Sequence, residues 1–199
     1  MIEALLFDLD GTLADTIAAN VEAYARALDE AGVSVSAATL ATTSAGRNWR
    51  QFLPPLIEAA GSQAEPAAVA SRKQALYREM VGQIRLNQPL LSLLIASHGP
   101  LKTALVTTAS RTNVDALIDA HGLRSLFDTI VTGDDVTAHK PDPAAYLMAS
   151  ERLGLPPQQC IAFEDSDIGV ASARAAGMGV VRIVFGLEPG DVAEPRPDS

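Results

Sequence analysis

The most constraining feature of this sequence is an acidic pair that follows its first apolar run. Residues 2–7 are mostly apolar, which is typical of a strand buried on both faces of a parallel sheet. Asp8 and Asp10 follow, separated only by Leu9. Because side chains alternate along a strand, both carboxylates are expected to leave its end toward the same side.

Two neighbouring carboxylates repel each other, and both stay ionised near neutral pH only beside a cation. A hard divalent ion with oxygen ligands fits this pair, and Mg²⁺ is the commonest such ion. Gly11 then allows a sharp turn and Thr12 adds a hydroxyl. An isolated Asp-x-Asp followed by glycine is also typical of an acidic turn that caps a helix, and this alternative stays open until the rest of the chain is considered.

The composition sets limits on the class of protein and on its partners. The chain has 199 residues, of which 48% are hydrophobic and 20% charged, so it can bury a sizeable core and accommodate one domain with a modest insertion. Its net charge of -9 argues against nucleic acid or an anionic membrane as a partner. A single cysteine, Cys160, excludes internal disulfides, and neither a signal peptide nor an apolar run of ~18 residues is recognisable. We therefore predict a cytoplasmic protein.

The order of predicted elements indicates an α/β fold. Strands at 2–7, 103–108, 127–132, 160–163 and 179–184 alternate with helices, except over an alanine-rich helical stretch after the first strand. This pattern predicts a doubly wound parallel sheet with a small inserted helical cap. We assign residues 1–15 and 91–187 to the core, 16–90 to the cap and 188–199 to a flexible tail. Within the cap, Pro54-Pro55 is expected to interrupt a helix over residues 40–60.

Polar side chains follow each strand at the sheet edge where ligands bind in such folds. The second strand is followed by hydroxyls and backbone N–H groups in Thr107-Thr108-Ala109, and the third by Lys140 in a Lys-Pro-Asp-Pro frame. The fourth ends in the acids Glu164 and Asp165. A nucleophile, an acid/base, a metal site and a positive clamp are the groups that phosphoryl transfer needs.

These four segments, in this order, resemble the haloacid dehalogenase (HAD) superfamily, in the phosphoglycolate phosphatase and beta-phosphoglucomutase-like branch with a helical cap. The resemblance extends to about residue 184. It implies a Rossmann-like core and a Mg²⁺-dependent phosphatase that hydrolyses a small phosphorylated metabolite through an aspartyl-phosphate.

The resemblance also implies a role for each motif residue. Asp8 would be the nucleophile, and Asp10 would protonate the leaving group and then activate water. Asp8, Asp10 through its carbonyl, and Asp165 would hold Mg²⁺, and Glu164 would act through water or as a second ligand. The phosphoryl group would be bound by three residues: Thr108, Ala109 and Lys140. Thr107 is the alternative to Thr108 as the motif hydroxyl.

The reaction and the substrate remain less constrained than the site. Thr12 and Asn20 stand where a beta-phosphoglucomutase usually carries valine and a hinge histidine, so we favour hydrolysis and keep the mutase as the alternative. A non-catalytic binding protein is disfavoured, since no motif residue is missing. Arg47, Trp49 and Arg50 of the cap are candidate substrate contacts, although Trp49 would equally suit the interior of the cap. The protein is expected to be a monomer or homodimer.

Overall fold

A parallel five-stranded sheet forms the core of the computed structural model, which describes residues 1–44 and 49–185. Its strand order is β3-β2-β1-β4-β5, and β1 lies at the centre between β2 and β4. The winding direction reverses at β1, which makes the crevice beyond its carboxyl end the expected ligand site. The strands are β1 (Ala4–Phe7), β2 (Lys102–Val106), β3 (Thr129–Val131), β4 (Cys160–Glu164) and β5 (Gly179–Arg182).

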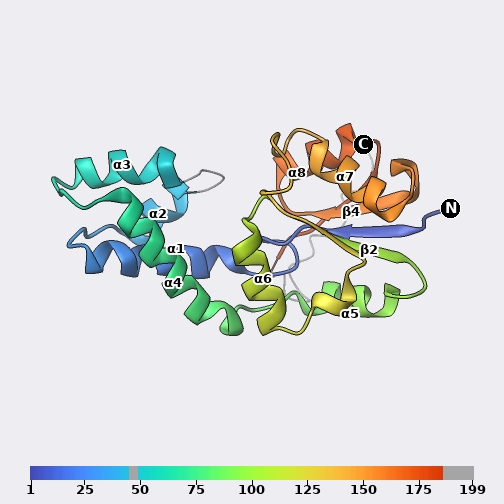
Figure 1. The fold of residues 1–199 in the computed structure, drawn as a ribbon, viewed down its shortest axis with the longest axis horizontal. Helices are drawn as coiled ribbons and strands as arrows, with labels where there is room; N and C mark the ends of the chain where they lie inside the picture. Colours follow the sequence, from blue (N-terminus) through green and yellow to red (C-terminus); the bar gives the residue numbers. More distant parts are fainter. Residues whose placement is uncertain (45–48, 186–199) are drawn as a thin grey trace, which may run out of the picture.

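Alternate residues of the central strand face two separate helical layers. Leu5 and Phe7 belong to a cluster with apolar side chains of α5 (Gln88–Ser97) and α6 (Arg111–Ala120). Ala4 and Leu6 instead pack with α7 (Ala144–Leu153) and α8 (Asp167–Ala175). The sheet therefore lies between two helix layers (Figure 1), and the predicted doubly wound fold is confirmed.

A group of helices is inserted between β1 and β2 and lies to one side of the sheet (Figure 1). These elements are α1 (Thr16–Glu30), α2 (Ala37–Ser44), α3 (Trp49–Ala59), α4 (Pro66–Met80) and the short 3-10 helix η1 (Val81–Gln83). The apolar cluster of the sheet continues into this group through α1 and α4. The cap boundaries at 16 and 90 stay a prediction, and α5, which starts at Gln88, already packs on the core.

The prolines of the cap do not interrupt a helix, so this prediction was wrong. Pro54 and Pro55 lie inside α3, which runs on to Ala59. Each proline removes a backbone donor and crowds the preceding turn. The burial of Phe52, Leu53 and Ile57 on one side of the same helix offsets that cost.

Two further predictions from the sequence concern membrane-spanning segments and the C-terminal tail. Among the described residues, none of the helices is long and apolar enough to span a bilayer. The predicted flexible tail at 188–199 lies outside the residues that the structure describes.

Candidate functional site

Acidic side chains from two neighbouring strands meet at the carboxyl edge of the sheet. Asp8 directly follows β1, and its N–H donates to the carbonyl of Phe163 in β4 (3.0 Å). Carboxylate oxygens of Asp8, Glu164 and Asp165 all lie within 4.8 Å of one another. Asp8 and Glu164 are buried, whereas Asp165 is half-buried. Three carboxylates this close in a largely buried place need positive charge beside them.

The turn after β1 allows this close approach. Gly11 has a φ of +80°, a conformation that side-chain-bearing residues rarely adopt. A Cβ at this position would overlap the Asp165 carboxylate. Its N–H donates to the Ala14 carbonyl (2.9 Å), which closes the turn. Glycine is therefore required both by the backbone and by the neighbouring acid.

Lys140 supplies positive charge from within the cluster. Its ammonium donates to Asp8 Oδ1 (2.7 Å), Glu164 Oε1 (2.5 Å) and the Val106 carbonyl (3.0 Å). Only 8% of the residue is exposed. Burial alone would lower the pKa of Lys140, but the two carboxylates raise it above its usual value. Lys140 is therefore a permanent cation whose donors face the nucleophile candidate.

The Asp10 carboxylate has different hydrogen-bond partners from the Asp8 carboxylate. It accepts hydrogen bonds from Thr16 Oγ1 (2.5 Å) and Thr107 Oγ1 (3.2 Å). Burial and the charge of Asp8 raise the pKa of Asp10 against the opposing effect of those two donors. A carboxyl group with a raised pKa is suited to give and take a proton near neutral pH.

The loop after β2 presents two threonines in different ways. Thr107 is buried and bonded to Asp10, and its hydroxyl also accepts from the Ala109 N–H (3.0 Å). Thr108 is exposed at the sheet edge. A Cβ at Gly133 would overlap the Thr108 carbonyl, so the loop is packed tightly from behind. The binding of phosphate by Thr108 and Ala109 stays a prediction.

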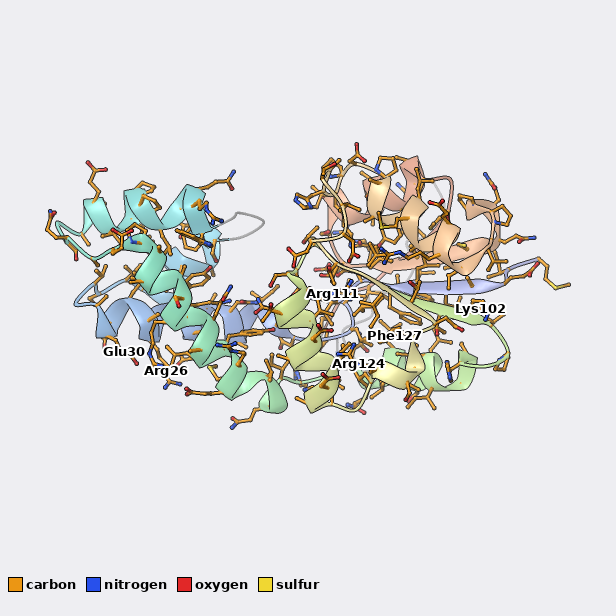
Figure 2. The ribbon with its side chains drawn as sticks, in the orientation of Figure 1. Arg26, Glu30, Lys102, Arg111, Arg124 and Phe127 are labelled. Atoms are coloured by element: carbon orange, nitrogen blue, oxygen red, sulfur yellow. The ribbon has the colours of Figure 1, made fainter. Side chains whose placement is uncertain are left out.

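Arg111 anchors the start of the helix that follows this loop. It lies at the carboxyl end of β2, whereas Lys102 lies at the opposite end of the same strand (Figure 2). The Arg111 guanidinium donates to Asp135 (2.5 Å), and its backbone N–H donates to Asp134 (2.7 Å). These bonds fix Arg111 and with it the C-terminal end of the 107–111 loop.

The acidic cluster fits a hard divalent cation. It offers only oxygen donors, which is the set that Mg²⁺ prefers. Burial and the charge of Asp8 raise the pKa of both Glu164 and Asp165. A cation among these oxygens would relieve that repulsion, and we identify this cluster as the candidate metal site.

Lys73 of the cap is a second buried cation, which was not predicted from the sequence. It lies on α4 and is only 5% exposed, and its ammonium donates to Asn20 Oδ1 on α1 (2.5 Å). The rings of Tyr24 and Tyr77 lie 4.9 and 4.6 Å from the nitrogen. Burial lowers the pKa of Lys73 to about 8. The helical spacing of Lys73 places it on the same face of α4 as the buried apolar residues. This spacing could have identified Lys73 from the sequence, because a lysine on a buried helix face is uncommon.

The cap residues proposed from the sequence have mixed outcomes. Arg47 lies outside the described residues. Trp49 is partly buried against the main apolar cluster, as the packing alternative predicts. The Arg50 guanidinium lies over the Trp49 ring at 4.5 Å. Their contact with a substrate stays a prediction.

A crevice of about 740 Å³ runs between the cap and the core. Gly11 and Asp165 border it on the core side, and α1 and α2 supply an apolar wall. Arg85 and Arg182 also line it, each in an ion pair with a nearby aspartate. Asp165 of the acidic cluster therefore borders a space that can take a small molecule.

A parallel sheet with an acidic pair after its first strand and a buried lysine beside it is the arrangement of a phosphotransfer-type α/β hydrolase. The sequence model of the haloacid dehalogenase-like hydrolase family matches residues 5–183 of this chain. The chain belongs to this family, and the resemblance seen in the four motifs is confirmed.

The chain is similar to proteins whose names or bound ligands include phosphorylated sugars. The chain is 33% identical over 179 residues to the fructose-1-phosphate phosphatase YqaB of Escherichia coli K12, covering 90% of this chain and 95% of that one. A crystallised candidate beta-phosphoglucomutase of Thermotoga maritima superposes with a TM-score of 0.82 at 30% identity, covering 96% and 89% of the two chains. A variant of CbbY from Rhodobacter sphaeroides, bound to xylulose 1,5-bisphosphate, gives a TM-score of 0.78 at 28% identity, covering 90% and 85%.

Proposed function

We propose that this hydrolase is a Mg²⁺-dependent phosphatase that cleaves a small sugar phosphate through a phosphorylated Asp8. The observation that carries the proposal is the contact of Asp8 with Lys140 inside the acidic cluster. There the carboxylate has a cation to balance its charge, and Asp165 of the same cluster borders an open crevice. The named activity of YqaB supports the choice of a sugar phosphate.

Two carboxylates carry the proposed chemistry. An oxygen of Asp8 attacks phosphorus, and the bond from phosphorus to the sugar oxygen breaks. Asp10 gives its proton to the departing sugar alkoxide. Asp10 then takes a proton from water, whose oxygen attacks the phosphorus and releases Asp8 and inorganic phosphate. The raised pKa of Asp10 fits this exchange of protons.

Charge on the phosphoryl oxygens requires compensation by fixed groups. Lys140 is oriented for this role by its contacts with Asp8 and Glu164, and we propose that Thr108 binds the same phosphoryl oxygens. The Ala109 N–H, which donates to Thr107 Oγ1, would join them by exchanging that acceptor for a phosphoryl oxygen. Asp8, Asp165, Glu164 and the Asp10 carbonyl would hold Mg²⁺. When bound, this ion neutralises negative charge on the transferred group.

The cap supplies candidates for recognising the rest of the substrate. We propose that Lys73, whose pKa is lowered by burial and raised less strongly by the charge of Asp10, attracts anionic or hydroxyl groups of the sugar toward the site. Arg47, Trp49 and Arg50 are proposed to contact the part of the substrate that lies beyond its phosphoryl group. A cytoplasmic location and a monomer or homodimer acting without nucleic acid or membrane complete the proposal.

A phosphomutase is the second candidate, and the similarity to the Thermotoga maritima structure favours it. Two residues argue for hydrolysis instead. Asn20 uses its amide to join the Thr16 carbonyl (3.0 Å) and Lys73, and an amide does not exchange protons. Thr12 places a hydroxyl 3.4 Å from Asp165. The mutase is therefore the alternative reaction, and it differs from the phosphatase in releasing no inorganic phosphate.

The test is phosphate release from a panel of sugar phosphates, phosphoglycolate and nucleoside monophosphates, with Mg²⁺ and then with EDTA. We expect one sugar phosphate to be turned over far faster than the others, and only with the metal. Conversion of beta-glucose 1-phosphate to the 6-phosphate without release would establish the mutase. Silence in both assays would contradict both reactions.

Asp8→Asn is expected to abolish turnover, because an amide oxygen is a poor nucleophile. Retained turnover by this variant would exclude the aspartyl-phosphate.

Lys140→Ala is expected to lower kcat/KM by at least about 100-fold, because a charge-neutralising donor at the transferred group is lost. The measurement is steady-state kinetics on the best substrate of the panel. Lys102→Ala removes an exposed lysine at the far end of β2 and serves as the matched control. An unchanged kcat/KM for Lys140→Ala would remove this residue from the site.

A further inference from the structure

The Glu164 carboxylate has hydrogen-bond partners outside the acidic cluster. Glu164 ends β4, and neither it nor Tyr146 of α7 exposes any surface. The Tyr146 hydroxyl donates to Glu164 Oε1 at 2.6 Å. The same oxygen accepts from the Lys140 ammonium at 2.5 Å. Tyr146 and Lys140 therefore share one carboxylate oxygen.

The opposite side of this carboxylate is closed by α8. A Cβ at Gly169 would overlap both Glu164 oxygens, so only glycine lets the helix pass this close. Ser166 Oγ, at the N-cap of α8, lies 3.4 Å from Oε2. Lys140 and Tyr146 hold one side of the Glu164 carboxylate, and α8 closes the other side. The carboxylate can therefore adopt only one orientation.

The orientation of Glu164 in turn determines where the Lys140 ammonium lies. An ammonium has three donors, and those of Lys140 are all in use, by Asp8, Glu164 and the Val106 carbonyl. Rotation of Glu164 would release one of these bonds and let the ammonium shift relative to Asp8. Precise placement of a charge at a reacting group matters more than its mere presence.

We propose that Tyr146 is a positioning residue, whose hydroxyl fixes Glu164 and thereby holds the Lys140 ammonium against Asp8. This inference rests on the proposed phosphatase function for its kinetic consequence, but the contacts themselves do not depend on it. Tyr146 touches no reacting atom and acts through Glu164. Its ring also packs in the apolar layer of α7, and its centre lies 5.1 Å from the Lys140 nitrogen.

Tyr146→Phe isolates the hydroxyl, because it keeps the ring, the packing and the cation–ring contact. We expect this variant to lower kcat/KM about tenfold, the size of effect typical of partners that orient a site residue. The affinity for inorganic phosphate, measured by calorimetry, should fall with it. Ser150→Ala removes another buried hydroxyl from the same helix, one that donates to the Leu147 carbonyl (2.9 Å), and should leave both quantities unchanged.

A double-mutant cycle separates positioning from a general loss of structure. If Tyr146 acts through Glu164, Tyr146→Phe should have no further effect on kcat/KM in a Glu164→Ala background, where no side-chain oxygen is left to accept from the Tyr146 hydroxyl. Additive losses, or an unchanged kcat/KM for Tyr146→Phe alone, would overturn the inference.

A crystal structure of Tyr146→Phe tests the same inference without any substrate. We expect the Glu164 carboxylate and the Lys140 ammonium to shift relative to Asp8, whereas unchanged contacts would contradict the proposal. Absence of turnover by the wild-type protein on every phosphomonoester would contradict the proposed function but leave this comparison decisive. The two failures are therefore distinguishable.

Discussion

At the scale of single residues, the burial of charge separates functional from structural positions. Lys140 is buried beside two carboxylates that stabilise its charge. Lys73 is buried beside an amide and two aromatic rings, and the described residues give its ammonium no carboxylate partner within ion-pair distance. A cation kept in such a place opposes folding, so a role in binding is the simplest reason for it.

The lowered pKa of Lys73 predicts how stability depends on pH. Its pKa is about 8 in the folded protein against 10.5 ordinarily, so between these pH values the unfolded chain holds a proton that the folded protein has lost. The free energy of unfolding should therefore rise with pH in this window, by roughly 3 kcal/mol in total. Urea unfolding of wild type and Lys73→Met measures this slope, which the variant should lose.

Lys102→Met is the matched control for that experiment, because it removes an exposed lysine. It should keep the pH dependence of the wild type. Equal slopes for Lys73→Met and wild type would show that the ammonium of Lys73 is not the group responsible.

At the scale of elements, the contact between α8 and β4 decides whether the site can form. Alanine is favoured over glycine inside a helix by ~1 kcal/mol, so helix propensity alone predicts that Gly169→Ala stabilises the protein. The new Cβ would overlap the Glu164 carboxylate, and either α8 or Glu164 must move. We expect a net destabilisation of ~1–3 kcal/mol, typical of overpacking, together with loss of activity.

Gly82→Ala gives the comparison at a glycine with open space around it. This residue lies in η1, and nothing stands within 4 Å of the position of its Cβ. The free energy of unfolding of the Gly82→Ala variant should match or slightly exceed that of the wild type. Thermal and urea unfolding of the two variants measures the difference, and equal effects of both would refute the packing argument.

At the scale of the whole molecule, metal binding should couple the two halves of the chain through the acidic cluster. Asp8 precedes the cap in sequence, and Asp165 follows β4 near the end of the sheet. A ligand at 100 times its dissociation constant stabilises the folded state by ~2.7 kcal/mol. Mg²⁺ should therefore raise the Tm by about 5–10 °C for a chain of this size.

Calorimetric scans with Mg²⁺, with EDTA and with NaCl at equal ionic strength measure this effect. Asp165→Asn should lose most of the shift, whereas Asp115→Asn, on the exposed surface of α6, should keep it. A shift of the same size in Asp165→Asn would place the metal elsewhere.

Much of the fold was predictable because its signals are local. The alternation of short apolar runs and helices predicts a doubly wound sheet, and the burial of β1 on both faces follows from its composition. The helix through Pro54 and Pro55 was not predictable, because its stability comes from the packing of Phe52 and Ile57 against other cap helices.

By itself, the sequence determined the family, the sheet and the edge at which the acids gather, since β-strand alternation and motif order need only neighbouring residues. Only the tertiary structure decided which groups complete the site. Lys73 meets Asn20 across 53 positions, and Tyr146 meets Glu164 across 18. Those partners lie on separate elements, so their contact depends on how helices pack on the sheet, and no local pattern encodes that packing.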